Sequence, residues 1–243
     1  MKAMNQKIKI IALILLFLPV LLLAETFELS IKYLGVSVVK VSMITEDSIL
    51  TVNAKSTFIA SIASNMNNSY RSVYSGNFLP STYKKTINQG DYFEYRTIEY
   101  NREILTAKRI SDVSPFYNCE YPIKPESRDF FSALFYLRKA IDEPSGELWI
   151  DANKLIWRVE YSIVGKEVIS TKLGKKQAIK VEMKFHNHLG EERERSDMLT
   201  NNLVNEERSL VFWFSDDEQR LPLKAKFKMK PFAVVWKLNS YIE

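Results

Sequence analysis

The chain contains one cysteine, Cys119, among its 243 residues, and this excludes an intramolecular disulfide. Only two histidines, seven glycines and eight prolines are present, so neither a histidine-based metal site nor a low-complexity segment is expected. The sequence also lacks a Gly-x-Ser-x-Gly elbow, a phosphate-binding loop and a dinucleotide-binding fingerprint. These absences argue against an enzyme without excluding one, and we assign no catalytic residue, cofactor or metal ligand.

The N-terminus has the pattern of a targeting segment over residues 1–24. Three lysines precede an almost wholly apolar run from Ile10 to Leu23, as in a secretory signal peptide. An uncleaved membrane anchor is the alternative. The run is short for a membrane span and contains Pro19, which favours cleavage near Ala24.

The charge balance depends on this segment. Removing its three lysines lowers the net charge from +5 to +2, so the charge predicts no nucleic-acid partner. We expect an exported protein, located in the periplasm or cell envelope of a Gram-negative bacterium. Once the signal peptide is removed, it should not be an integral membrane protein.

The remaining chain is predicted to be mainly β. With 46% hydrophobic and 12% aromatic residues it has enough apolar material for a core. Short β-branched segments alternate with turn signals, which is typical of a single antiparallel meander forming a curved sheet or an open β-barrel. No linker divides residues 25–243, so we expect a single β-rich domain. The expected strands span residues 27–33, 36–44, 48–55, 71–75, 82–88, 92–100, 104–110, 147–150, 154–164, 166–173, 176–185, 209–214, 221–229 and 233–241.

One segment has a helical pattern instead. In "SRDFFSALFYLRKAIDEP" apolar residues recur at helical spacing, which predicts an apolar helix near residues 128–142 packed on the sheet. Asp129 or Ser127 would cap its first turn, and Pro144 would end it. Two further stretches, around Ile62 and around Asp197, fit a short helix or a loop equally well.

Three stretches carry a resemblance to a known family. They are "DFFSALFYLR" (129–138), "GKEVISTKLGKKQAIKVE" (165–182) and "VFWFSDDEQRLPLKAKFKM" (211–229), with "YLGVSVVKVSM" and "SGNFLPSTYKK" further upstream. Together they resemble the exported bacterial family known as domain of unknown function 3108. The chain departs from that family at Lys230-Pro231-Phe232, where relatives tend to have a glycine. The resemblance implies a β-rich envelope protein and no established activity.

The acids at Asp216, Asp217 and Glu218 could form a catalytic or metal-binding cluster. They lack the alternating spacing and the glycine of a calcium loop, however, and Asp and Ser are favoured in turns. We therefore predict a hairpin turn, with Arg220 folding back on one of the carboxylates.

Asp129 and Arg138 bracket the predicted helix. They are either a cap and a charge that favours the helix end, or a charged pair at the rim of a ligand cavity. The candidate ligand-rim or family-motif residues are therefore Asp129, Arg138, Asp216, Asp217 and Arg220.

Two further patterns have simple interpretations. Lys224, Lys226, Lys228 and Lys230 alternate with apolar residues, which indicates a solvated sheet face or a platform for anionic lipid or polysaccharide. The pair His186 and His188 has no third ligand of the usual kind nearby, so these are taken as surface residues.

Three functions fit the sequence. The first is a non-catalytic envelope protein that binds an apolar or amphipathic ligand, such as a lipid or glycolipid. The second is a structural or assembly factor that contacts another envelope protein, and the third is an envelope hydrolase. Export and the missing catalytic motifs favour the first.

Overall fold

The computed structural model describes residues 24–113, 118–152, 155–188, 190, 197–229 and 232–243. The predictions for the signal peptide, for Lys230 and for most of the Lys230-Pro231-Phe232 departure lie outside these residues. The strands are β1 (Glu25–Tyr33), β2 (Val36–Glu46), β3 (Ile49–Ser56), β4 (Asn67–Ser75), β5 (Leu79–Gln89), β6 (Tyr92–Asn101), β7 (Thr106–Ser111), β8 (Cys119–Pro122), β9 (Arg128–Asp129), β10 (Ser145–Ala152), β11 (Leu155–Thr171), β12 (Gly174–Asn187), β13 (Leu210–Ser215), β14 (Pro222–Met229) and β15 (Phe232–Ile242). The helices are α2 (Phe58–Ser61), α3 (Phe130–Ala140), α4 (Met198–Leu203) and the 3₁₀ turn η1 (Gly76–Phe78).

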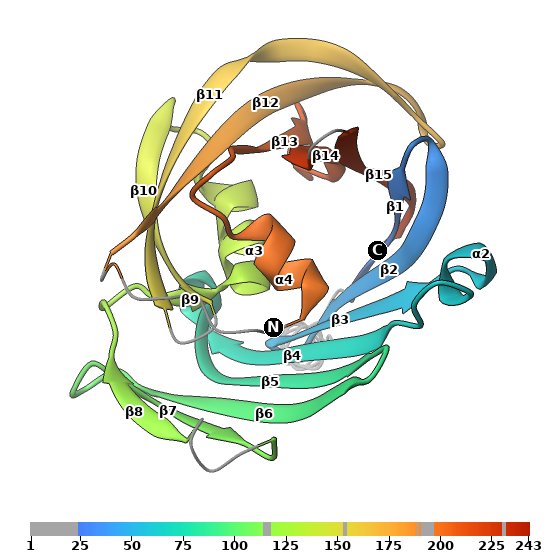
Figure 1. Ribbon diagram of the computed structural model, residues 1–243. Coiled ribbons are helices and arrows are strands. Elements are labelled where there is room, and N and C mark those ends of the chain that lie inside the picture. The colour runs from blue at the N-terminus through green and yellow to red at the C-terminus, as the bar shows by residue number, and fades with distance from the viewer. Residues whose placement is uncertain (1–23, 114–117, 153–154, 189, 191–196, 230–231) are drawn as a thin grey trace, which may run out of the picture.

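All fifteen strands belong to one sheet, in the order β8-β7-β6-β5-β4-β3-β2-β1-β15-β14-β13-β12-β11-β10-β9. Two meanders meet in its middle, where the first strand pairs antiparallel with the last. The sheet curls around α3 and α4, while α2 projects from its outside (Figure 1). Because β8 and β9 are the ends of the order, the curled sheet is not closed. The predicted curved antiparallel sheet is thus confirmed.

Three details differ from the prediction. The short strands β8 and β9 were not expected, and β9 pairs parallel with β10 rather than antiparallel. The two strands expected at 154–164 and 166–173 form the single strand β11, whose register shifts between Ile163 and Gly165. A bulge of this kind bends a strand without ending it, so the glycine resembled a turn in the sequence.

The predicted apolar helix is confirmed as α3. Asp129 caps it, and its side chain accepts hydrogen bonds from the backbone N–H groups of Phe131 and Ser132. Phe135 is fully buried and contacts Phe27 and Phe78, with ring centroids 5.6 and 5.8 Å apart. The helix therefore fills one part of the space inside the sheet with aromatic side chains.

The two ambiguous stretches both contain short helices. α2 lies at the start of the stretch around Ile62, and none of its residues is buried. α4 begins after Asp197 and buries Leu199, Thr200 and Leu203. Within the described part of the chain, no helix combines the length and apolar character needed to cross a membrane.

Candidate functional site

Both internal helices begin at a buried aspartate that faces β4. At α3, the Oδ2 atom of Asp129 accepts hydrogen bonds from the hydroxyls of Ser72 and Ser132, at 2.7 and 2.5 Å. Burial raises the pKa of Asp129, although its hydrogen bonds, led by that from Ser132, oppose the shift. Since Ser72 belongs to β4, this carboxyl group fixes the start of α3 to the wall of the sheet.

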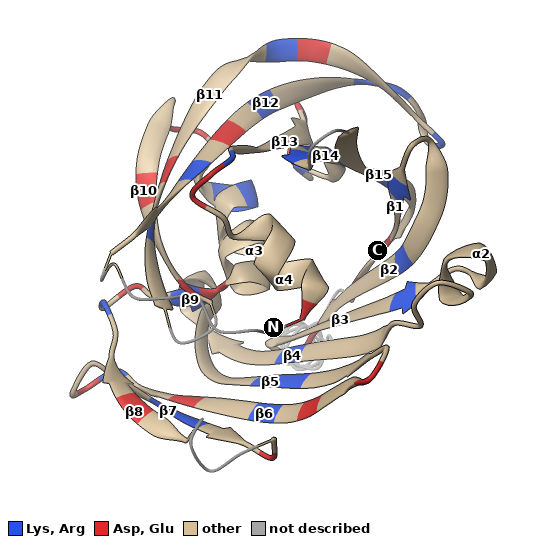
Figure 2. Ribbon diagram, in the orientation of Figure 1, with Lys and Arg blue, Asp and Glu red and all other residues tan. Residues whose placement is uncertain are grey.

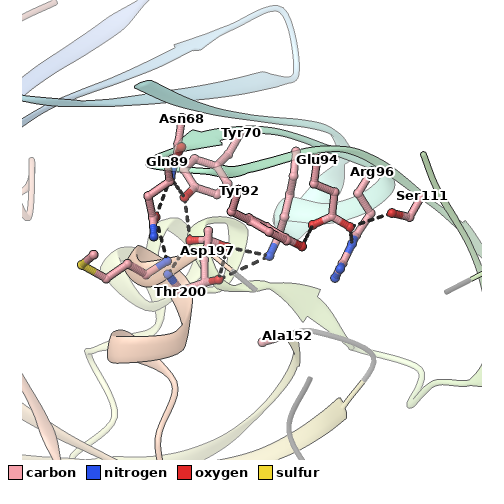
Figure 3. A network of polar contacts seen from close by, with 12 residues as sticks. Asn68, Tyr70, Gln89, Tyr92, Glu94, Arg96, Ser111, Ala152, Asp197 and Thr200 are labelled. Carbon is pink, nitrogen blue, oxygen red and sulfur yellow. Dashed lines mark hydrogen bonds and ion pairs between the residues drawn. The ribbon is translucent and has the colours of Figure 1, made fainter. Parts of the chain in front are cut away.

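At α4 the corresponding residue is Asp197, which has a charged partner (Figure 3). Its carboxylate lies 3.0 Å from the ammonium group of Lys85 and accepts a 2.6 Å hydrogen bond from the Tyr70 hydroxyl. Burial alone would raise the pKa of Asp197, but the charge of Lys85 and hydrogen bonds from Thr200 and Tyr70 lower it to about 2. Both Asp197 and Lys85 are almost completely buried. The short helix α4 is thus held to β5 by an ion pair and to β4 by a hydrogen bond.

A third aspartate, Asp151 on β10, lies beside Asp129 across the parallel β9–β10 pair. Its Oδ2 atom accepts hydrogen bonds from the hydroxyls of Tyr100 and Tyr121, at 3.0 and 2.8 Å. Its Oδ1 atom is buried and has no hydrogen-bond partner among the described residues. Burial raises the pKa of Asp151 to about 6, although the two tyrosines and the charge of Lys85 oppose this. This carboxyl group is therefore protonated more readily than an exposed aspartate.

Next to these aspartates lies a buried ion pair on the inner face of β6. Arg96 Nε lies 2.6 Å from a carboxylate oxygen of Glu94, which also accepts hydrogen bonds from Tyr92 and Ser111 (Figure 3). Carboxylates and basic groups buried together are found in active sites, but structural networks also contain them. No group of three or more His, Cys, Asp or Glu side chains in the described chain could hold a metal ion. Asp129 and Asp197 contact the starts of α3 and α4 and the wall of the sheet, so these two aspartates position the helices.

An apolar cavity of about 200 Å³ lies between α4 and the inner face of β1, β2, β14 and β15. Among the described residues of its lining, Asn202 is the only one with an amide or charged side chain, and Met198, also in the lining, is 45% exposed at the mouth. The other lining residues are Ile31, Tyr33, Val38, Val39, Met66, Leu199, Leu203, Phe227, Met229, Val234 and Trp236. The cavity is larger than the ~150 Å³ engineered cavity that binds benzene. It can therefore accept a small hydrocarbon group.

The structure separates the two residues that bracket α3. Asp129 is buried at the first turn, whereas Arg138 in the last turn binds both carboxylate oxygens of Glu25, at 3.0 and 2.9 Å. Arg138 also donates to the backbone carbonyls of Gln219 and Arg220. The contacts of Asp129 match the interpretation as a helix cap. Asp129 and Arg138 do not form a charged pair.

The acidic segment after β13 is a turn, as predicted. The Arg220 guanidinium donates to Asp216, 3.1 Å away, and to Asp142 near the end of α3. Asp217 accepts hydrogen bonds from the Ser215 hydroxyl and from the backbone N–H of Arg220. A hydrogen bond from Lys166 is the main cause that lowers the pKa of Asp216, and Arg220 acts in the same direction. Arg138, Asp216, Asp217 and Arg220 therefore lie together at the end of the sheet opposite the mouth of the cavity.

The sequence prediction missed Lys85, Asp151 and Asp197 as members of one network. Each lies far from the others along the chain, and only the curled sheet brings them together. One signal was present: Lys85 alternates with Tyr83 and Ile87, so it shares their face of β5, and all three are buried. A charge at an inward position of a strand predicts a buried partner.

The comparisons with known structures support the fold. A β-barrel-like protein of domain of unknown function DUF1849 from Brucella abortus has a TM-score of 0.55 at 8% identity. The similarity covers 91% of this chain and 97% of that protein. A DUF1329 family protein from Desulfovibrio piger ATCC 29098 has a TM-score of 0.21 at 11% identity, over 91% of this chain and 86% of that one, too low for any structural argument.

No curated protein matches the chain at a significant level. The model of the family described as "Protein of unknown function (DUF3108)" matches residues 26–231. This range holds almost the whole sheet, from β1 to the end of β14. The chain therefore belongs to the DUF3108 family.

Proposed function

We propose that this chain is an exported cell-envelope protein that binds an apolar or amphipathic ligand without catalysis. The observation that supports the proposal is the cavity beside α4, whose lining is apolar apart from Asn202. The apolar segment at residues 10–23, with lysines before it, supports export.

The size of the cavity limits the ligand. Pockets that enclose a drug-sized molecule usually measure about 300–1,000 Å³, and this one measures about 200 Å³. It would hold one hydrocarbon arm of a ligand and leave the polar end at the mouth near Met198. A single acyl chain fits this description better than a flat polar molecule, because the lining offers almost no hydrogen-bond partners.

Binding of a fluorescent fatty acid tests the proposal. Asn202 lines the cavity and is only partly buried, so Asn202→Phe should fill the space with little effect on folding. We expect affinity for the probe to fall on the order of tenfold or more, because the loss of a few buried methylene contacts is worth about 1.4 kcal/mol or more.

Asn201→Phe is the matched control, since Asn201 is on the same helix, is also partly buried and does not line the cavity. It should bind the probe like the unmodified chain. The proposal fails if the unmodified chain binds no probe, or if the two variants bind it equally well.

A further inference from the structure

An apolar surface lies beside the cavity, at the end of the strands that line it. It is formed by the tip of the β1–β2 hairpin, by α2 with the residue after it, and by the start of β15. Its exposed side chains, called here the apolar rim, are Leu34, Val36, Phe58, Ile59, Ile62 and Phe232. The most exposed are Phe58 at 83% and Ile62 at 78%. Exposed apolar patches of this kind mark sites of protein or membrane contact.

Ring packing and backbone hydrogen bonds join the parts of the apolar rim to the wall of the cavity. The Tyr33 ring lines the cavity and packs edge-on against Phe232, with centroids 5.9 Å apart. Thr57, which caps α2, donates from its backbone N–H to the carbonyl of Val38, another lining residue. The β3–β4 connection, which contains α2, returns to the sheet at Met66, which also lines the cavity. The apolar rim therefore lies at the cavity mouth.

Behind the apolar rim, lysines cross the outer face of the sheet from strand to strand. Lys55 on β3 lies opposite Lys40 on β2, and Lys40 lies opposite Ser30 on β1. Ser30 lies opposite Lys237 on β15, which in turn lies opposite Lys224 on β14. These four lysines are called here the lysine belt. Figure 2 shows basic segments on β2 and β3 on the side from which α2 projects.

The lysine belt places like charges directly opposite each other, at Lys40–Lys55 and at Lys224–Lys237, which destabilises a sheet. The pKa of Lys224 is lowered by burial and by the charges of neighbouring lysines, including Lys237, while Glu167 opposes the shift. An anionic surface would relieve this repulsion.

The strand segments between the lysine belt and the apolar rim carry only positive charge. From the lysine belt to the apolar rim, the described parts of β1, β2, β3, β14 and β15 contain no acidic residue, and they add Lys32, Lys226 and Lys228. Residues 57–66, which include α2, contain no charge at all. Apolar side chains at the tip with lysines behind them match the boundary between acyl chains and anionic head groups.

We infer that the apolar rim inserts into the surface of an anionic lipid bilayer and that the lysine belt contacts its head groups. This inference builds on the proposed function, because docking would place the cavity mouth against a source of acyl chains. The occupant is the bilayer itself, and α2 is the segment that enters deepest.

Flotation with lipid vesicles tests the inference. The chain from Glu25 onward is suitable, since it contains all fifteen strands and lacks the apolar N-terminal run. It should float with vesicles of phosphatidylcholine and phosphatidylglycerol, and much less with phosphatidylcholine alone. Phe58→Ser, Ile59→Ser and Ile62→Ser combined should lower the partition coefficient for the vesicles on the order of a hundredfold. The reason is that three large apolar groups no longer enter the bilayer.

Lys40→Gln and Lys55→Gln combined should lower binding to the anionic vesicles on the order of tenfold and leave the neutral vesicles unaffected. Two matched controls use exposed residues elsewhere in the described chain. Phe93→Ser, Ile104→Ser and Val168→Ser remove similar apolar groups, and Lys172→Gln with Lys175→Gln removes the same charge. Both controls should bind like the unmodified chain.

The inference is overturned if the unmodified chain does not float, if phosphatidylglycerol makes no difference, or if the rim variants match their controls. It is also overturned if light scattering without vesicles shows a dimer that the α2 substitutions abolish, since the rim would then join two copies. The Asn202→Phe variant separates the two proposals: it should still float. If the unmodified chain floats but binds no fatty acid, membrane docking stands and the proposed ligand is wrong. If it binds the fatty acid but does not float, only membrane docking is wrong.

Discussion

Two helices lie inside the curled sheet, and both begin at a buried aspartate that reaches β4. α3 has eleven residues, and eight of them are buried, including three phenylalanines. α4 has six residues, and it buries only three of them. The longer helix fills its part of the interior, while the shorter one leaves the apolar cavity at its side.

The two helix starts also differ in charge. The carboxyl group of Asp129 receives hydrogen bonds from serine hydroxyls and backbone N–H groups, whereas Asp197 is paired with the ammonium group of Lys85. A long apolar helix is held in place by its own packing. A helix of six residues is too short to be stable alone, so a buried ion pair holds it over the cavity. The comparison shows how one sheet can support a filled region and an apolar cavity side by side.

We expect the largest effect on stability when the capping aspartates Asp197 and Asp129 are substituted. Asp197→Asn keeps a capping side chain but leaves Lys85 buried without its counter-charge, so we expect a loss of about 3–5 kcal/mol in the free energy of unfolding. Asp129→Asn removes no charged partner and should cost about 1 kcal/mol. Urea denaturation of the two variants measures the difference. Equal losses would show that the ion pair does not distinguish α4 from α3.

The next effect concerns the pH dependence of stability. The pKa of Asp151 is about 6 in the folded chain against an ordinary value of 3.8, so the folded state binds a proton that the unfolded state releases. The free energy of unfolding should therefore fall by about 2 kcal/mol as the pH rises from about 4 to about 6. Asp151→Asn should remove most of this slope. The variant Asp91→Asn, at an exposed turn, is the control and should keep it.

We expect the smallest effect on stability at the C-terminal end of α3. Arg220 contacts Asp216 and the exposed Asp142 near the surface, so Arg220→Gln should cost at most about 1 kcal/mol. Arg138→Gln should cost more, about 1.5–3 kcal/mol, because Arg138 is largely buried and binds Glu25 with two hydrogen bonds. Thermal unfolding of both variants compares them. If Arg220→Gln is the more harmful change, the turn and not Arg138 fixes the end of α3.

Much of the local structure could be predicted from neighbouring residues. The spacing of apolar residues in α3, the capping by Asp129 and the turn closed by Arg220 and Asp216 involve residues close together along the chain. The period-two segments likewise predicted most strands. The Ile163–Gly165 bulge was mistaken for a turn, because a glycine between two β-branched segments is typical of both features.

The site could not be predicted in the same way. Lys85 and Asp197 are 112 residues apart, and β1 pairs with β15 across the whole length of the chain. Pairings of this kind depend on how the sheet curls, which no local pattern encodes. The sequence by itself determined most of the strands, the apolar helix and its cap, since short-range sterics and hydrogen bonds govern these. Only the tertiary structure decided which charges are buried together, where the cavity opens and which apolar side chains lie beside it, because burial depends on contacts between distant strands.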